Sequence, residues 1–186
     1  MTELSALWLP ILLSGVFVFV ASSIIHMALP WHKSDYLKAP NEDRVMDGIR
    51  AMAIPPGDYM IPRPATRDDM RSKAFAEKMA KGPVLVMTVF PAGSMSMGRN
   101  LALWFLYCVI VSGFAALVAG GAVQPGADSH AAFHFSAITA FVGYSVALWQ
   151  MSIWYRRSWA TTVKATIDGL IYAVMTGATF MWLWPQ

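Results

Sequence analysis

The last apolar run of the chain reads Lys164-Ala-Thr-Ile-Asp168-Gly169-Leu-Ile-Tyr172-Ala-Val-Met-Thr-Gly177. Its one carboxylate, Asp168, lies among residues that suit a membrane interior, where an unpaired charge costs roughly 3 kcal/mol or more. Lys164 precedes Asp168 by four residues and Tyr172 follows it by four, so the three side chains share one face of a helix. The run therefore predicts a helix whose polar face needs a partner within the protein.

The composition of the whole chain indicates a membrane protein. Of the 186 residues, 56% are hydrophobic and 13% are charged, and the mean hydropathy of +0.47 does not fit a soluble surface. The single cysteine, Cys108, excludes a disulfide framework and a thiolate metal cluster, and we expect it to be a small buried core residue. The first apolar run has no basic residue before it and is longer than the core of a signal peptide, so we interpret it as a retained membrane segment.

Four apolar runs are long enough to cross a bilayer. Pro30 ends the first run, Gly120-Gly121 the second and Arg156-Arg157 the third. We predict an all-α membrane protein, an up-down bundle of four transmembrane helices with a small cytoplasmic α+β cap between helices 1 and 2. Its predicted parts are transmembrane helix 1 in residues 1–30, the cap in 31–100, and transmembrane helices 2, 3 and 4 in 101–119, 131–155 and 163–184.

The positions of the basic residues predict the orientation of these helices. Eleven of the 14 Lys and Arg residues lie between Lys33 and Arg99, and the other three lie between Arg156 and Lys164. Because cytoplasmic loops are enriched in Lys and Arg, we place the connections 31–100 and 156–162 in the cytoplasm. The connection between the second and third runs has no basic residue and is predicted to lie outside, together with both termini.

The predicted cap is too long to be a bare linker, and its pattern indicates a small folded unit. Capping residues and apolar spacing predict one helix over 41–53 and a second over 66–81. Two short, proline-bounded segments, 58–61 and 84–90, should pair as a small sheet. The alternative is that residues 84–98 lie along the membrane surface.

Candidate site residues lie where the first apolar run ends: His26 is about one turn inside it, and His32 and Asp35 lie just beyond it, close enough to join a contact made by His26. The predicted orientation puts His26 at the depth of Asp168, so a contact between these two would link the first and last helices through a polar latch of His26, Lys164, Asp168 and Tyr172. As metal ligands, His26, His32, Asp35 and Asp168 make a mixed imidazole and carboxylate set of the kind that binds iron, zinc or manganese. Their spacing across a proline is not a defined ligand motif, so we favour hydrogen-bonded packing over a metal.

Two further histidines, His130 and His134, lie four residues apart at the start of the third run. They could bind a metal or a porphyrin-type pigment from one helix face, although interfacial polar side chains are the favoured interpretation. They lie on the opposite side of the membrane from His26, so the four histidines do not form one site. Eight of the 13 methionines lie between Met46 and Met97, where we expect them to fill core gaps rather than bind copper.

Small residues recur every four positions along two of the runs. This spacing lets helices approach closely, which is how bundles pack within lipid. The last run has such a face at Ala165, Gly169, Ala173 and Gly177, and the second has one at Ser112, Ala116 and Gly120.

Several motifs resemble those of a group of small bacterial membrane proteins of unknown activity. They are His26-Met-Ala-Leu-Pro-Trp-His32-Lys-Ser-Asp35-Tyr36, Pro40-Asn-Glu42, Pro56-Gly57-Asp-Tyr59-Met, Asp168-Gly-Leu-Ile-Tyr172 and Trp182-Leu-Trp-Pro185. The resemblance covers nearly the whole chain. It implies a bacterial inner membrane and brings no activity or ligand residues.

The function predicted from these features is that of a structural or accessory subunit in a larger membrane complex, such as a bioenergetic one. We expect the lipid bilayer and other membrane subunits as partners and no nucleic acid. The absence of a cofactor is the favoured expectation, and a metal or a pigment is the alternative. One alternative is a small metal-dependent or redox enzyme that uses His26, His32, Asp35 and Asp168. The other is a proton-coupled transporter, for which the apolar runs offer few polar residues.

Overall fold

The computed structural model describes residues 2–93 and 95–185, so Met1, Ser94 and Gln186 of the predicted segments lie outside the described residues. The chain forms two compact units. The first, which we call the helical unit, combines the chain up to Leu37 with the chain from Ser96 onward. The second, the small unit, spans Lys38–Met95.

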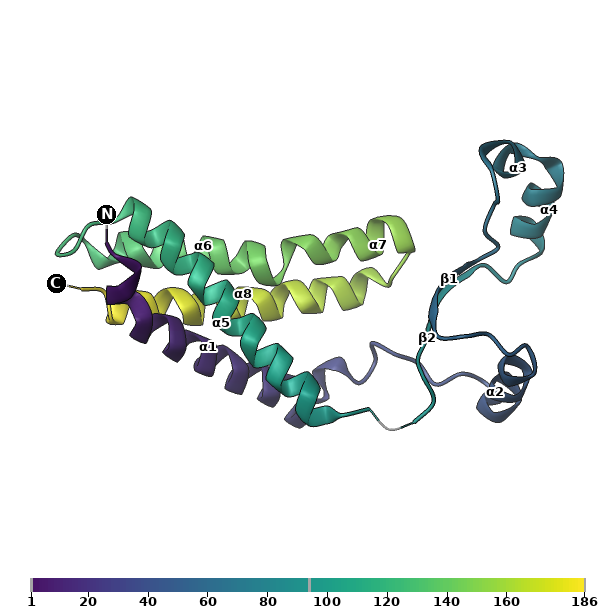
Figure 1. Cartoon of the computed structure of the whole chain (residues 1–186), viewed down its shortest axis with the longest axis horizontal. Coiled ribbons are helices and arrows are strands. Elements are labelled where there is room, and N and C mark those ends of the chain that lie inside the picture. Colours follow the sequence, from purple (N-terminus) through teal and green to yellow (C-terminus); the bar gives the residue numbers. More distant parts are fainter. Residues whose placement is uncertain (1, 94, 186) are drawn as a thin grey trace. The chain divides into compact units, whose positions relative to one another are not determined.

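Long helices make up the helical unit (Figure 1). Both ends of the described chain lie at the same end of these helices (Figure 1). In chain order the elements are the 3-10 helix η1 (Leu4–Leu7), α1 (Trp8–Ser23), the π-helical turn η2 (Ile24–Ala28), the 3-10 turn η3 (Pro30–His32), α5 (Met97–Ala122), α6 (Ser129–Tyr144), the 3-10 turn η4 (Val146–Leu148), α7 (Trp149–Tyr155) and α8 (Trp159–Trp182).

Three helical segments are long and apolar enough to cross a membrane: Leu4–Ala28, Met97–Ala122 and Ser129–Tyr155. They confirm the prediction of a helical chain compatible with a multi-pass membrane protein. The helix α8 has 24 residues, but it is not among these three segments. Its sequence includes Lys164, Asp168 and five threonines, which make it more polar than the others.

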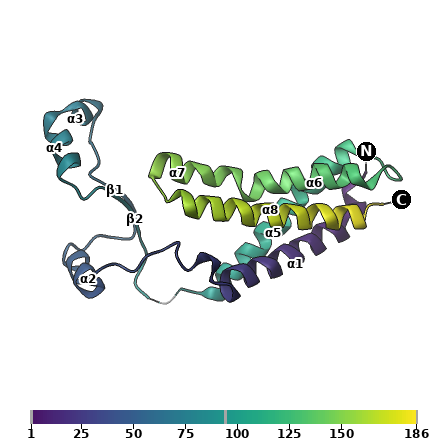
Figure 2. The same ribbon diagram turned by 180° about the vertical axis from the view of Figure 1, so that it is seen from behind.

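Two apolar core clusters connect the long helices at different levels. One contains Leu7, Ala116, Ala132 and Phe180, and the other contains Val18, Cys108, Ala140 and Tyr172. Each cluster therefore draws on the first helical segment and on α5, α6 and α8. In both views α8 lies beside α1 and α6 (Figures 1 and 2). The expected burial of Cys108 is confirmed.

The predicted close approach of small residues is confirmed where α8 meets α6. A Cβ atom placed on Gly177 would lie 2.8 Å from the Phe133 ring and 2.9 Å from the Ala137 methyl group. A Cβ atom on Gly169 would overlap the Ser145 hydroxyl. These two glycines let the helix backbones approach closely without a side chain between them.

The third predicted span is not one regular helix. It divides at Ser145 into α6 and α7, which the short 3-10 turn η4 joins. Hydrogen bonds connect α7 to α8 across this region, because Ser152 and Thr162 share one and the Trp149 indole donates another to Thr166.

A buried hydroxyl pair connects α1 to α5, where Ser14 and Ser112 lie 2.9 Å apart, oxygen to oxygen. We expect a double-mutant cycle of Ser14→Ala and Ser112→Ala to give a coupling energy of about 0.5–1.5 kcal/mol, the range of hydrogen bonds between membrane helices. The measurement is unfolding of the purified protein in detergent. Ser23→Ala is the control for Ser14→Ala, because the Ser23 hydroxyl bonds only within its own helix. Strictly additive effects of the two substitutions would contradict the prediction.

The small unit contains α2 (Glu42–Ala51), α3 (Arg67–Arg71), α4 (Lys73–Lys81) and two strands, β1 (Gly57–Ile61) and β2 (Leu85–Val89). The strands pair antiparallel, with Tyr59 opposite Met87, so the predicted two-stranded sheet is confirmed. The three helices have no buried residue among those described.

The predicted helix over 66–81 is wrong in one respect, because it is divided at Ser72. The extended backbone of Ser72 ends α3, and its hydroxyl accepts a hydrogen bond from the Phe75 amide, which makes it the N-cap of α4. The predicted capping at Thr66 is present, since Thr66 accepts from the Asp69 amide and the Asp69 carboxylate accepts from the Ala65 amide.

Candidate functional site

The chain after α1 folds back on itself through two unusual turns. Residues Ile24–Ala28 form a π-helical turn in place of the regular helix predicted up to Leu29. Leu29 is extended, with φ −89° and ψ 148°, as expected for a residue before proline. Pro30 then begins the 3-10 turn η3, which ends at His32. These two turns bring the side chains of Trp31, His32, Ser34 and Asp35 against α8.

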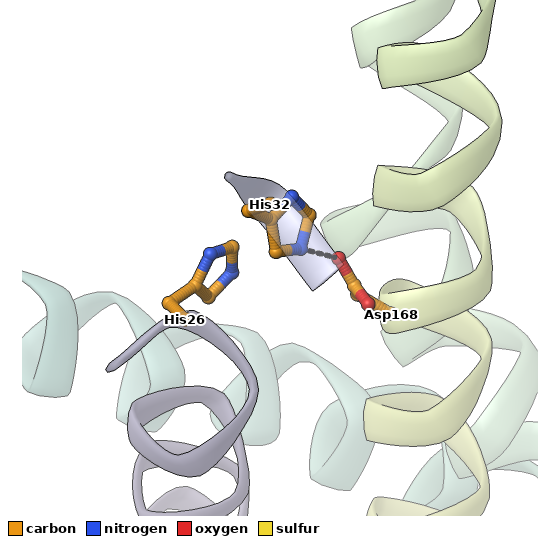
Figure 3. A group of neighbouring side chains, drawn as sticks. All are labelled: His26, His32 and Asp168. Atoms are coloured by element: carbon orange, nitrogen blue, oxygen red, sulfur yellow. Dashed lines mark hydrogen bonds and ion pairs between the residues drawn. The ribbon is translucent and has the colours of Figure 1, made fainter. Parts of the chain in front are cut away.

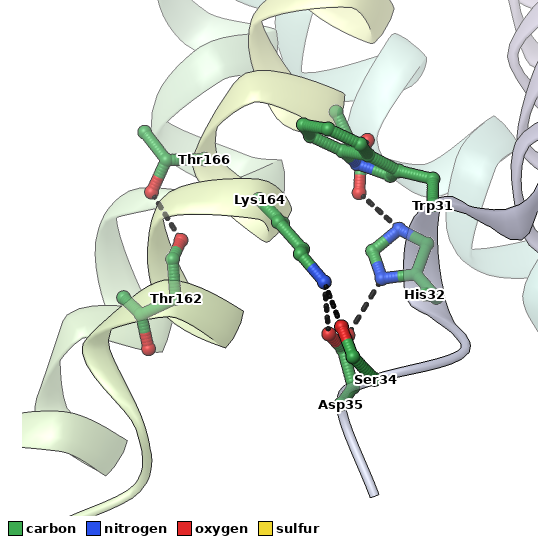
Figure 4. Close-up of polar contacts among 8 residues, drawn as sticks. Trp31, His32, Ser34, Asp35, Thr162, Lys164 and Thr166 are labelled. Carbon is green, nitrogen blue, oxygen red and sulfur yellow. Dashed lines mark hydrogen bonds and ion pairs between the residues drawn. The ribbon is translucent and has the colours of Figure 1, made fainter.

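The imidazole of His32 lies between two carboxylates (Figure 4). Its Nδ1 is 2.6 Å from Asp35 Oδ2, and its Nε2 is 2.8 Å from Asp168 Oδ2. Asp168 is only 3% exposed, and the His32 and Asp35 side chains are also largely buried. One ring therefore joins the segment after the first helix to the middle of α8.

Other side chains complete the hydrogen bonding of both carboxylates. The Trp31 indole donates to Asp168 Oδ1 over 3.1 Å. The Lys164 ammonium group donates to Asp35 Oδ1 over 2.9 Å and to the Ser34 hydroxyl over 2.8 Å, and it lies 5.7 Å from the centre of the Trp31 ring (Figure 4). We call Trp31, His32, Ser34, Asp35, Lys164 and Asp168 together the polar cluster.

The charges of the polar cluster balance in one protonation state. An ionised carboxylate only accepts hydrogen bonds, so two ionised partners require both ring nitrogens of His32 to donate. The cluster then holds two positive groups, His32 and Lys164, and two negative ones, Asp35 and Asp168. Burial opposes ionisation of Asp35, but hydrogen bonds from His32 and Lys164 outweigh it and hold the pKa of this carboxyl below its ordinary value of 3.8.

His26 stacks against one face of the His32 ring, and it is His32 that forms the hydrogen bond with Asp168. The two imidazoles stack with ring centres 4.1 Å apart and 21° between their planes (Figure 3). One nitrogen of each imidazole and one Asp168 oxygen lie within 4.8 Å of one another. The predicted hydrogen bond from His26 to Asp168 is thus replaced by one from His32, because η3 carries His32 over the carboxylate.

Tyr172, the fourth residue of the predicted latch, does not join the polar cluster. Its ring packs edge-on against Tyr144, with the ring centres 5.4 Å apart. Its buried hydroxyl has no hydrogen-bond partner among the described residues. Tyr172 is therefore a core residue between α8 and α6.

His130 and His134 lie apart from the other candidate residues, in the first two turns of α6. Both side chains are exposed, and the Asp128 carboxylate caps this helix by accepting from the His130 amide. In the part of the chain that the structure describes, the one group of three potential metal ligands is His26, His32 and Asp168. The structure thus gathers ligands at the end of the first helix and leaves this second histidine pair outside the group.

A shallow apolar cleft of about 540 Å³ adjoins the polar cluster. It is lined by Ile25, Leu29, Pro30, Trp31, Ile167, Asp168 and Ile171, so a single carboxylate faces a mostly aliphatic surface. Trp31 and Asp168 belong to both the cleft and the polar cluster. The cleft thus extends from the polar cluster over the apolar surfaces of the first helical segment and α8.

Trp31 and Ser34 belong to the polar cluster, but sequence reasoning does not single them out as site residues. For Trp31 the sequence indicates only an aromatic residue at the membrane interface. A further signal is present, because Asp168 needs donors and the indole N–H of a tryptophan at a membrane interface can supply one. Ser34 gives no comparable signal, since a serine in a loop is ordinary.

The fold is compatible with a multi-pass membrane protein, and the polar cluster places largely buried ionisable groups between the segment after the first helix and α8. Comparison of the chain with protein-family models, with curated proteins and with solved structures found no match. The proposals below therefore rest on the residues and geometry of this chain.

Proposed function

We propose that this chain is a four-span protein of a bacterial inner membrane that serves as a structural or accessory subunit of a larger membrane complex. The observation that carries the proposal is the pairing within the polar cluster. Each of its four ionisable side chains lies within hydrogen-bond distance of an ionisable side chain of the opposite type, acid or base, and these contacts join the segment after the first helix to α8. Such pairing favours a role in holding helices together.

The packing of α8 supports its assignment as the fourth span of a helical bundle. Phe180 is in one core cluster with Leu7, and Tyr172 is in the other with Val18. Because α8 packs against the first helical segment in both core clusters, we expect it to cross the bilayer if that segment does. The polar residues of α8 are accommodated because Asp168, Thr176 and Thr179 are buried against protein.

Site-specific labelling tests the number of spans and the orientation. In a Cys108→Ser background, Lys73→Cys and Arg157→Cys are expected to react with a membrane-impermeant thiol reagent only from the cytoplasmic side. Gln124→Cys is expected to react only from outside, and a reporter joined to the C-terminus is expected to be active outside. A cytoplasmic C-terminal reporter together with an external Gln124→Cys would contradict the fourth span.

Purification in mild detergent tests the role as an accessory subunit. The protein is expected to elute in a complex with other membrane proteins in fixed stoichiometry, and Asp168→Asn is expected to reduce the yield of this complex. A control preparation of Asp47→Asn, which changes an exposed carboxylate of the small unit, should give the normal yield. A monodisperse particle that contains this chain alone would contradict the proposal.

A further inference from the structure

We infer that His26, His32 and Asp168 bind one divalent first-row transition-metal ion through two imidazole nitrogens and one carboxylate oxygen. This inference goes beyond the proposed structural role and does not depend on it. It begins with the gathering of three potential ligand atoms within 4.8 Å of one another (Figure 3). The three residues come from the π-helical turn η2, the 3-10 turn η3 and α8.

The distance between His32 and Asp168 is close to that between two ligands of a bound ion, and His26 lies within 4.8 Å of both. Bonds of about 2.0–2.1 Å in tetrahedral or octahedral geometry place neighbouring ligand atoms roughly 2.8–3.4 Å apart. His32 Nε2 and Asp168 Oδ2 are already 2.8 Å apart. The ion would take the place of the proton between them, so this edge of the site needs only a small opening.

His26 is available to supply the third bond. Its side chain is exposed, and no hydrogen bond joins it to the described residues. Its ring stacks on the ring of His32. A rotation of this imidazole toward Asp168 would break no hydrogen bond, whereas the polar cluster already fixes the other two ligands.

The outer hydrogen bonds match those that orient metal ligands. A ligating histidine usually donates its second ring N–H to a carboxylate, and ligating carboxylates are themselves hydrogen-bonded. Asp35 accepts from His32 Nδ1 over 2.6 Å and is held in turn by Lys164. Trp31 donates to Asp168 Oδ1. These contacts hold His32 Nε2 and Asp168 Oδ2 facing each other, 2.8 Å apart.

The ligand chemistry selects the class of ion. Imidazole suits zinc, iron, copper and nickel, and a carboxylate favours harder ions such as manganese, so two imidazoles with one carboxylate fit zinc, iron or manganese. The set has no thiolate or thioether to select copper(I), and it has too few oxygen atoms for calcium. Three protein ligands also leave at least one position of the ion to water or another small molecule.

Metal titration of the purified full-length protein tests the inference. The protein carries an affinity tag without histidines, is stripped with a chelator, and is titrated with Co²⁺ while its visible absorption is recorded. We expect d–d bands that saturate at one ion per chain and disappear when Zn²⁺ is added. Elemental analysis after Zn²⁺ loading and desalting is expected to give the same stoichiometry.

Substitutions identify the ligands and separate metal binding from folding. His26→Ala is expected to weaken Co²⁺ binding at least tenfold while leaving thermal unfolding of the metal-free protein unchanged, because His26 takes no part in the hydrogen bonds of the cluster. Asp35→Asn, which acts on His32, is expected to weaken binding about 10- to 100-fold. His134→Ala is the matched control and should bind as the wild type does. Absence of saturable Co²⁺ bands, or equal affinity of the wild type and His26→Ala, would overturn the inference.

Discussion

Replacing Asp168 by alanine is expected to lower the free energy of unfolding of the metal-free protein in detergent by about 3–5 kcal/mol, the usual loss when one partner of a buried ion pair is removed. Asp168 is 3% exposed and holds both His32 and Trp31. Without it, the His32 imidazole faces an apolar gap and the Trp31 indole loses its acceptor. Chemical denaturation monitored by circular dichroism in the presence of a chelator measures this loss without a contribution from bound metal.

Two further variants separate the charge of Asp168 from its packing. Asp168→Asn keeps an oxygen for the Trp31 indole, so it is expected to cost less than the alanine variant, roughly 2 kcal/mol. The control is Asp128→Ala, which removes an exposed helix cap in the same unit and should cost about 1 kcal/mol. If Asp168→Asn were as stable as the wild type and assembled normally but had lost function, the structural interpretation of the polar cluster would be refuted.

The long helices and the small sheet could be predicted from the sequence because both depend on local patterns. Three apolar runs stand out by length and hydropathy alone, and residues 84–90 are rich in valine between prolines. The α8 helix could also be predicted as a helix, but its assignment as a span depends on packing against neighbours. Hydropathy does not describe that packing, because Asp168 is compensated by Trp31 and His32, which are far from it in the sequence.

The choice of His32 over His26 as the partner of Asp168 could not be predicted from the sequence. If the first helix continued regularly to Leu29, His26 would lie within the membrane at the depth of Asp168, and His32 would lie outside the membrane on the cytoplasmic side. In the structure, the π-helical turn η2 and the 3-10 turn η3 change the direction of the chain and bring His32 back over α8. The proline at residue 30 predicts that the helix ends, but neither turn type follows from a proline alone.

The second large effect is expected at Gly177, where Gly177→Val should lower the free energy of unfolding by about 3 kcal/mol, the upper end of the usual range for overpacking. A Cβ atom at this position meets the Phe133 ring at 2.8 Å and the Ala137 methyl group at 2.9 Å. The Ala137 methyl group is fixed to its backbone, and Phe133 lies between the two helices. The contact is therefore relieved mainly by separation of α8 from α6. Unfolding in detergent, measured as for Asp168, gives the change.

A matched glycine on another helix distinguishes this packing effect from the effect of valine on any membrane helix. Gly113 lies within α5, and a Cβ atom placed on it would meet no neighbouring atom within 4 Å, so Gly113→Val is expected to change the free energy of unfolding by less than about 1 kcal/mol. The difference between the two variants isolates the cost of separating α6 from α8. Because α8 also carries Lys164 and Asp168, Gly177→Val should in addition weaken Co²⁺ binding, whereas Gly113→Val should not. Equal losses of stability at the two glycines would show that close contact between α6 and α8 does not hold the last helix in place.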